Sequence, residues 1–162
     1  MILQRDKKSK IYTQTEKQKI AQQKNQYYQK LIDQMTEKDI LPGISLFIQE
    51  LKEHGYKIAL ASASENAEKI LHQLGLTDSF DYIADVKTIL KSKPEPDIFL
   101  ACAEQLGVEP LACIGIEDAE SGIEAIHRAD MKAIGVGNPE QMRKADLIVR
   151  TSELKLDLIY NL

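Results

Sequence analysis

The chain has 162 residues, of which 43% are hydrophobic and 28% charged, and its formal net charge is −4. This composition predicts a globular protein with one domain, or one domain and an appendage. The net negative charge gives no reason to expect nucleic acid or an anionic membrane as a partner, and no apolar run reaches membrane-span length. Because the N-terminus also lacks the apolar core of a secretory signal, we expect a cytoplasmic protein.

The N-terminal part of the chain has the pattern of helices. Met1-Ile2-Leu3 looks like the last turn of a helix whose earlier part is missing, and the basic residues at 5–10 predict a solvated face or a helix end. Thr13-Gln-Thr-Glu16 fits a capping box, which predicts the start of a long helix with apolar residues from Ile20 to Met35. Lys24 lies on that apolar stripe. It either extends past the stripe to water or projects as a cation into a cleft, and periodicity does not decide between the two.

Leu41-Pro-Gly43 interrupts the chain, and an alternation of strands and helices follows. Short apolar runs predict strands, at 57–61, 82–84, 112–116, 132–136 and 147–149. Amphipathic segments predict helices, at 44–54, 67–74, 98–106 and 119–129, with a short terminal helix that holds Leu154, Leu158 and Ile159. This alternation predicts an α/β fold with a parallel sheet. Cys102 and Cys113 lie in apolar periods and are expected to be buried reduced thiols rather than a disulfide or a metal pair.

Polar side chains follow three of the predicted strands, at the end where open α/β sheets bind ligands. Ser62 and the amides after it suit an anion, although Ser62 and Glu65 also have the spacing of a capping box. Lys93, stiffened by two nearby prolines, suits a phosphate, with a solvated charge run as the alternative. Glu117 and Asp118 suit Mg²⁺, with a helix cap at Asp118 as the alternative. Together, hydroxyl, ammonium and carboxylate groups are what a metal-bound phosphoryl group requires.

Three segments resemble the later motifs of the haloacid dehalogenase superfamily, at 59–66, 93–99 and 116–123. Three more narrow the resemblance to the β-phosphoglucomutase branch: Lys24-Asn25, Leu41-Pro-Gly-Ile44 and Ile134-Gly-Val-Gly137. The resemblance implies a Rossmann-like core over 41–162 and a partial helical cap over 1–40. It also implies Mg²⁺ as cofactor and exchange between β-glucose 1-phosphate and glucose 6-phosphate through an aspartyl-phosphate.

The resemblance also assigns roles to individual residues. Ser62 and Lys93 would be catalytic, and together with the amide of Ala63 they would hold the transferring phosphoryl group. Glu117 and Asp118 would hold the metal. The distal end of the substrate, a small phosphorylated sugar, would be held by Ser64, Asn66 and Lys24.

The family carries its nucleophile in an Asp-x-Asp motif that follows an apolar strand. No predicted strand of this sequence is followed by that motif, and Asp6 cannot replace it because it stands in a polar stretch. In the family, the strand of that motif lies between the strands that end at Ser62 and at Glu117. We therefore expect two open strand edges, a slot between the helix layers, and a chain that is unstable and inactive by itself.

A separate N-terminal piece or a second copy would complete the sheet. The simplest account is a truncated reading frame in which Met1 is an internal methionine of the cap. The alternatives are a sugar-phosphate phosphatase of the same superfamily and a non-catalytic phosphate-binding or interaction module.

Overall fold

The computed structural model describes residues 12–162, which divide into two units between Met35 and Thr36. The interpretations of Met1-Ile2-Leu3, of the basic residues at 5–10 and of Asp6 fall outside the described residues.

The first unit contains helix α1 (Gln14–Ile32), which begins with the predicted capping box. The backbone N–H of Thr13 donates to the Glu16 carboxylate at 2.7 Å, and the Thr13 hydroxyl accepts from the Glu16 N–H at 3.3 Å. The apolar stripe of α1 is largely exposed: Tyr27 is 65% exposed, whereas Ile32 is buried. Lys24 is exposed as well.

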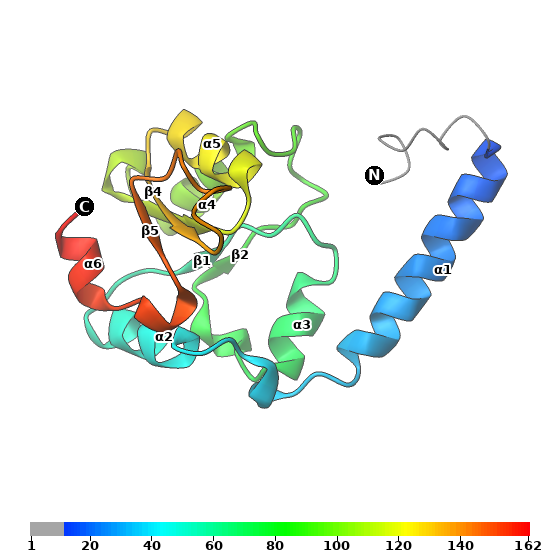
Figure 1. The fold of residues 1–162 in the computed structure, drawn as a ribbon, viewed down its shortest axis with the longest axis horizontal. Coiled ribbons are helices and arrows are strands. Elements are labelled where there is room, and N and C mark those ends of the chain that lie inside the picture. The colour runs from blue at the N-terminus through cyan, green and yellow to red at the C-terminus, as the bar shows by residue number, and fades with distance from the viewer. Residues whose placement is uncertain (1–11) are drawn as a thin grey trace. The chain divides into compact units, whose positions relative to one another are not determined.

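The second unit alternates helices and strands along the chain (Figure 1). Its longer elements are α2 (Ile44–Glu53), β1 (Ala59–Leu60), α3 (Ala67–Gln73), β2 (Tyr82–Ile83), α4 (Asp97–Leu106), β3 (Ile114–Glu117), α5 (Glu120–Arg128), β4 (Lys132–Val136), β5 (Leu147–Val149) and α6 (Leu156–Tyr160). The helix α4 ends where expected because Gly107 adopts the left-handed conformation, with φ of 64°. The predicted α/β fold is therefore confirmed.

The strands form two separate parallel sheets rather than one. β1 pairs with β2, and β3, β4 and β5 pair in that order. Several bounds differ from the sequence-based expectation, most of them by one residue. Strand β1 is shorter than the apolar run at 57–61, β3 begins only after a 3-10 turn over Pro110–Ala112, and α6 begins after Leu154.

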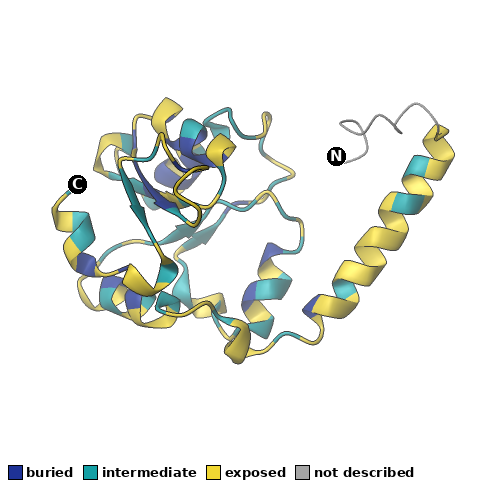
Figure 2. Ribbon diagram, in the orientation of Figure 1, coloured by how far each residue is buried: buried dark blue, intermediate teal, exposed yellow. Residues whose placement is uncertain are grey.

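Two apolar layers cover opposite faces of the three-stranded sheet. On β4, Ala133 belongs to a cluster with residues of α4 and α5, and its neighbour Ile134 belongs to a cluster with residues of α2 and α6. This follows from the alternation of side chains along a strand. Both residues are 0% exposed, and Figure 2 shows the buried residues gathered around β4. Close packing of α5 on β3 depends on Gly115, because a Cβ there would collide with Ile126.

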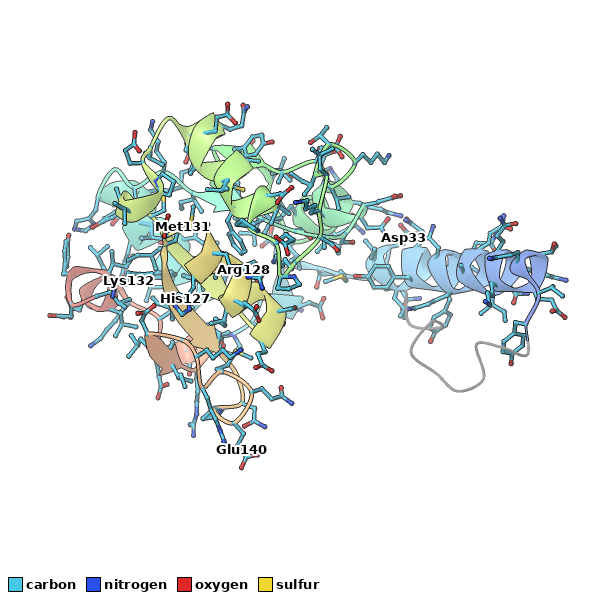
Figure 3. All side chains as sticks on the ribbon, turned by 90° about the horizontal axis from the view of Figure 1, so that it is seen from above. Asp33, His127, Arg128, Met131, Lys132 and Glu140 are labelled. Atoms are coloured by element: carbon cyan, nitrogen blue, oxygen red, sulfur yellow. The ribbon has the colours of Figure 1, made fainter. Side chains whose placement is uncertain are left out.

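A polar cluster joins the end of α5 to the two strands that follow it. Asp146, just before β5, accepts from the backbone N–H of Ala133 at 2.8 Å, and its carboxylate pairs with His127 at 2.9 Å and with Lys132 at 3.3 Å. Figure 3 labels His127 and Lys132 close together at the junction of α5 and β4. The hydrogen bonds from Ala133 and His127, and the charge of Lys132, lower the pKa of Asp146 to about 2.

The two cysteines are unpaired, as expected. Cys102 is buried, whereas Cys113 is only half-buried. Burial raises the pKa of the Cys102 thiol to about 11. None of the helices in the described part of the chain is long and apolar enough to cross a membrane.

Candidate functional site

A slot separates β1 from β3. Both strands line one cavity of about 1200 Å³, although they belong to different sheets. Two carbonyl oxygens in and just before β1 accept hydrogen bonds from residues that flank β2. The N–H of Asp81 donates to Ile58 at 2.8 Å, and the N–H of Ala84 donates to Leu60 at 3.0 Å. Because alternate residues of a parallel strand bond in opposite directions, the N–H and C=O of Ala59 point away from β2, toward the cavity.

Exposure of strand residues confirms that this slot is open. In β4, which has a partner on each side, Ala133 and Ile134 are fully buried. In β3, which is paired with β4 alone, Ile116 is 39% exposed. An apolar residue in a strand between two helix layers is normally buried, so its exposure marks a place where packing is incomplete. The predicted slot between open strand edges is thus present.

Lys93 links the carboxyl-terminal ends of the two strands. Its ammonium donates to the carbonyl oxygen of Ala61, just after β1, at 3.1 Å and to the Glu117 carboxylate, the last residue of β3, at 2.7 Å. It also lies 4.8 Å from the centre of the Phe99 ring, within the range of a cation–π contact. The side chains of Lys93 and Glu117 are 16% and 11% exposed, so this ion pair is shielded from water. The solvated-charge interpretation of Lys93 is therefore wrong.

Glu117 has room for its side chain because Gly122 lacks one. A Cβ on Gly122, in the first turn of α5, would overlap the carboxyl group of Glu117. Asp118 follows Glu117 and is exposed at the cavity. The N-cap of α5 is Ala119, so the alternative interpretation of Asp118 as a helix cap is wrong.

Ser62 lies in the loop between β1 and α3. Its hydroxyl oxygen accepts from the N–H of Ser64 at 3.2 Å, and the Ser64 hydroxyl accepts from the N–H of Asn66 at 3.2 Å. Asn66 is the N-cap of α3. The capping-box interpretation of Ser62 and Glu65 is therefore wrong, and the amides next to Ser62 precede the helix rather than form its N-terminus. The hydroxyl hydrogen of Ser62 can still be donated to an anion.

The structure brings most of the expected site residues to one cavity. Ser62 and Lys93 line it, and so do Ala63, Ser64, Glu117 and Asp118. Asn66 is not among the described residues that line this cavity, and Lys24 belongs to the first unit. Sequence reasoning assigned no site role to Phe99 or Gly122. The position of Gly122 near the start of a helix, shortly after a carboxylate, was the available sequence signal for its role.

Glu117 and Asp118 are two adjacent carboxylates and do not form a complete protein cage for Mg²⁺. Among residues 12–162, no group of three or more His, Cys, Asp or Glu side chains is placed to hold a metal ion. Magnesium commonly takes one or two carboxylates and completes its octahedron with water and substrate phosphate. Glu117 and Asp118 match that donor set, with Glu117 already neutralised by Lys93.

Comparison with known proteins decides the family. The model of the haloacid dehalogenase-like hydrolase family matches residues 3–130. The chain belongs to this family. Within the haloacid dehalogenase-like proteins, the chain is 50% identical over 150 residues to β-phosphoglucomutase of Bacillus subtilis, which covers 92% of this chain and 66% of that protein. It is thus a homologue of β-phosphoglucomutase.

Two further relatives extend this result. The crystal structure of β-phosphoglucomutase from Clostridium difficile superimposes with a TM-score of 0.87 at 47% identity, covering 93% of this chain and 68% of that one. Hexitol phosphatase B of Escherichia coli K12 is 42% identical over 103 residues, or 62% of this chain and 46% of that protein. This member of the haloacid dehalogenase-like family therefore spans between about half and two thirds of these relatives' length.

Proposed function

We propose that the chain is a β-phosphoglucomutase-like protein that binds the phosphoryl group of a small phosphorylated sugar, with Mg²⁺, at the carboxyl-terminal end of the slot. In a completed site the reaction is the exchange between β-glucose 1-phosphate and glucose 6-phosphate. The chain alone binds the phosphorylated sugar but does not catalyse the reaction. The observation that supports this is the shielded ammonium of Lys93, fixed between Ala61 and Glu117.

Each of the side chains around the slot can make a different contact with a bound phosphate. Lys93 supplies positive charge where the low exposure of its side chain strengthens electrostatic attraction. Ser62 donates its hydroxyl hydrogen to a phosphoryl oxygen, and the N–H of the next residue, the exposed Ala63, lies in the same loop. Glu117 and Asp118 would hold Mg²⁺, which neutralises the phosphoryl oxygens when bound.

Turnover needs a nucleophile that the described cavity does not offer. Among residues 12–162, the carboxylates that line it are Glu117 and Asp118. Glu117 is bound to Lys93, and both belong to the proposed metal site. With both carboxylates assigned to the metal, and Glu117 also paired with Lys93, the described lining leaves no further carboxylate to form a covalent phosphoryl intermediate. We therefore expect binding without isomerisation.

Titration calorimetry with β-glucose 1-phosphate and Mg²⁺ tests the binding step. The variant Lys93→Met, which keeps chain length but removes the charge, should bind at least about tenfold more weakly, because it loses a shielded charge-assisted contact. The matched control is Lys91→Met, an exposed lysine of the same loop, which should bind like the unmodified chain. Equal weakening in both variants, with folding verified by circular dichroism, would contradict the proposed phosphate site.

Hydrolysis of a phosphate ester is the second candidate, favoured by the 42% identity to hexitol phosphatase B. The two reactions share the phosphoryl site and differ in whether water or a sugar hydroxyl accepts the phosphoryl group. We expect the chain, mixed with the part of the B. subtilis relative that it does not match, to isomerise β-glucose 1-phosphate. Release of inorganic phosphate without glucose 6-phosphate would instead support the phosphatase.

A further inference from the structure

We propose that Phe99 is a positioning residue for Lys93. Its ring holds the ammonium from one side and leaves one N–H of that ammonium free to donate to a phosphoryl oxygen in the cavity. This inference rests on the proposed function, because it takes Lys93 as the residue that binds phosphate. It adds a residue that acts on the ligand through Lys93.

The Lys93 ammonium has one more donor than the described residues accept. An ammonium group carries three N–H donors and no acceptor. The carbonyl oxygen of Ala61 accepts one of them at 3.1 Å, and the Glu117 carboxylate accepts another at 2.7 Å. Within residues 12–162 these are the hydrogen bonds of the ammonium, so one donor remains for a ligand. Lys93 lines the cavity, and a ligand can therefore reach this donor from there.

The Phe99 ring attracts the ammonium without accepting a hydrogen bond from it. The Lys93 nitrogen lies over the ring, 4.8 Å from its centre. This separation exceeds the length of an ordinary hydrogen bond, about 3 Å, but lies within the range of a cation–π contact. The attraction is strengthened by shielding from water, since the Lys93 side chain is 16% exposed. The ring therefore fixes the cation and leaves its third donor to the ligand.

The core keeps the Phe99 ring itself in place. Phe99 is 6% exposed and belongs to the apolar cluster that α4 shares with α5. Its backbone is fixed as well, because its N–H donates to the carbonyl oxygen of Pro96 at 2.9 Å. A rigid ring restricts the positions open to the Lys93 ammonium before phosphate arrives. Less conformational entropy is then lost on binding.

Phe99 also fills the core, so its truncation would disturb packing and positioning together. Trifluorophenylalanine, with fluorine on the ring carbons farthest from the backbone, separates the two roles. Fluorine withdraws electrons from the face of the ring and weakens cation–π attraction, with little change in ring size. The matched control is the same replacement at Phe47, which is also buried and lines the same cavity but belongs to the other apolar cluster.

Urea unfolding of the full chain, with and without Lys93→Met, tests the contact between ring and ammonium. Fluorination of Phe99 should lower the urea midpoint when Lys93 is present and should have little effect in the Lys93→Met background. Fluorination of Phe47 should change the midpoint equally in both backgrounds. Equal shifts of the midpoint in both backgrounds on fluorination of Phe99 would show that this ring only packs, and would overturn the proposal.

Titration calorimetry with inorganic phosphate and Mg²⁺ tests the effect of the ring on binding. The chain fluorinated at Phe99 should bind phosphate about three- to tenfold more weakly, and the chain fluorinated at Phe47 should bind like the unmodified chain. Unchanged or tighter binding on fluorination of Phe99 would overturn the proposal, because the ring would then not orient the ammonium.

The two assays distinguish failure of this inference from failure of the proposed function. If the unmodified chain binds no phosphate, the proposed function is wrong, and so is the role of Phe99 in binding. The unfolding comparison needs no phosphate and still decides whether the ring holds the ammonium.

Discussion

The variant Gly122→Ala tests the packing that holds the Glu117 carboxylate in place. In an ordinary helix this replacement stabilises by about 1 kcal/mol, because alanine has the higher helix propensity. Here a Cβ on Gly122 would overlap the carboxyl group of Glu117. The Glu117 side chain must then rotate away and release Lys93, to which it is bound at 2.7 Å.

The two effects have opposite signs, and their magnitudes decide the outcome. Loss of a shielded charge-assisted hydrogen bond costs about 1.5–3 kcal/mol. After subtraction of the helix-propensity gain, Gly122→Ala should lower the free energy of unfolding by about 1 kcal/mol. For a domain of this size, that lowers Tm by about 2–4 °C.

Urea unfolding of four proteins provides the assay: the unmodified chain, Gly122→Ala, Glu117→Ala and the double variant. With Glu117 truncated there is no collision, so Gly122→Ala should now stabilise by about 1 kcal/mol. The coupling energy between the two positions should be about 2 kcal/mol. Stabilisation by Gly122→Ala in the unmodified chain, with no coupling to Glu117, would refute the packing of Glu117 against α5.

Two further predictions concern titratable groups. Because the pKa of Asp146 is lowered from 3.8 to about 2 in the folded state, its carboxylate stabilises the fold above pH 4, and this contribution disappears as the pH falls through 2. Asp146→Asn should therefore be less stable by about 1 kcal/mol at pH 7, reduced by the partial exposure of the group, and should unfold in urea like the unmodified chain at pH 2. Because its pKa is about 11, Cys102 should react with iodoacetamide at pH 8 at least about a hundredfold more slowly than a free thiol, as followed by mass spectrometry. Equal urea midpoints of the Asp146 pair at pH 7, or rapid alkylation of Cys102 in the folded chain, would contradict these assignments.

Periodicity and glycine positions were sufficient to predict most helices and strands. The helix over Asp97–Leu106 is an example, since its apolar face and its terminal glycine are both local signals. The bounds of β1 were less predictable, because the run at 57–61 is apolar throughout but only Ala59–Leu60 has a partner in β2. The length of a strand is set by how many of its residues form hydrogen bonds with a neighbouring strand. That neighbouring strand comes from residues far away in the chain.

The candidate site was predictable as a set of residues and not as a set of contacts. Spacing placed Lys93 and Glu117 at the ends of elements that meet, but their ion pair and the ring of Phe99 beneath the ammonium depend on packing between layers. The capping role expected of Ser62 failed for a similar reason. Its hydroxyl bonds to Ser64, and the helix begins four residues later than that role requires.

The slot connects stability with function in this chain. The open edges of β1 and β3 and the exposure of Ile116 raise the free energy of the folded state. At the carboxyl-terminal end of the same slot, the shielded ammonium of Lys93 is held by Ala61 and Glu117. Because Lys93 lines this same slot, an agent that stabilises the fold through the slot should also change the affinity of the proposed phosphate site.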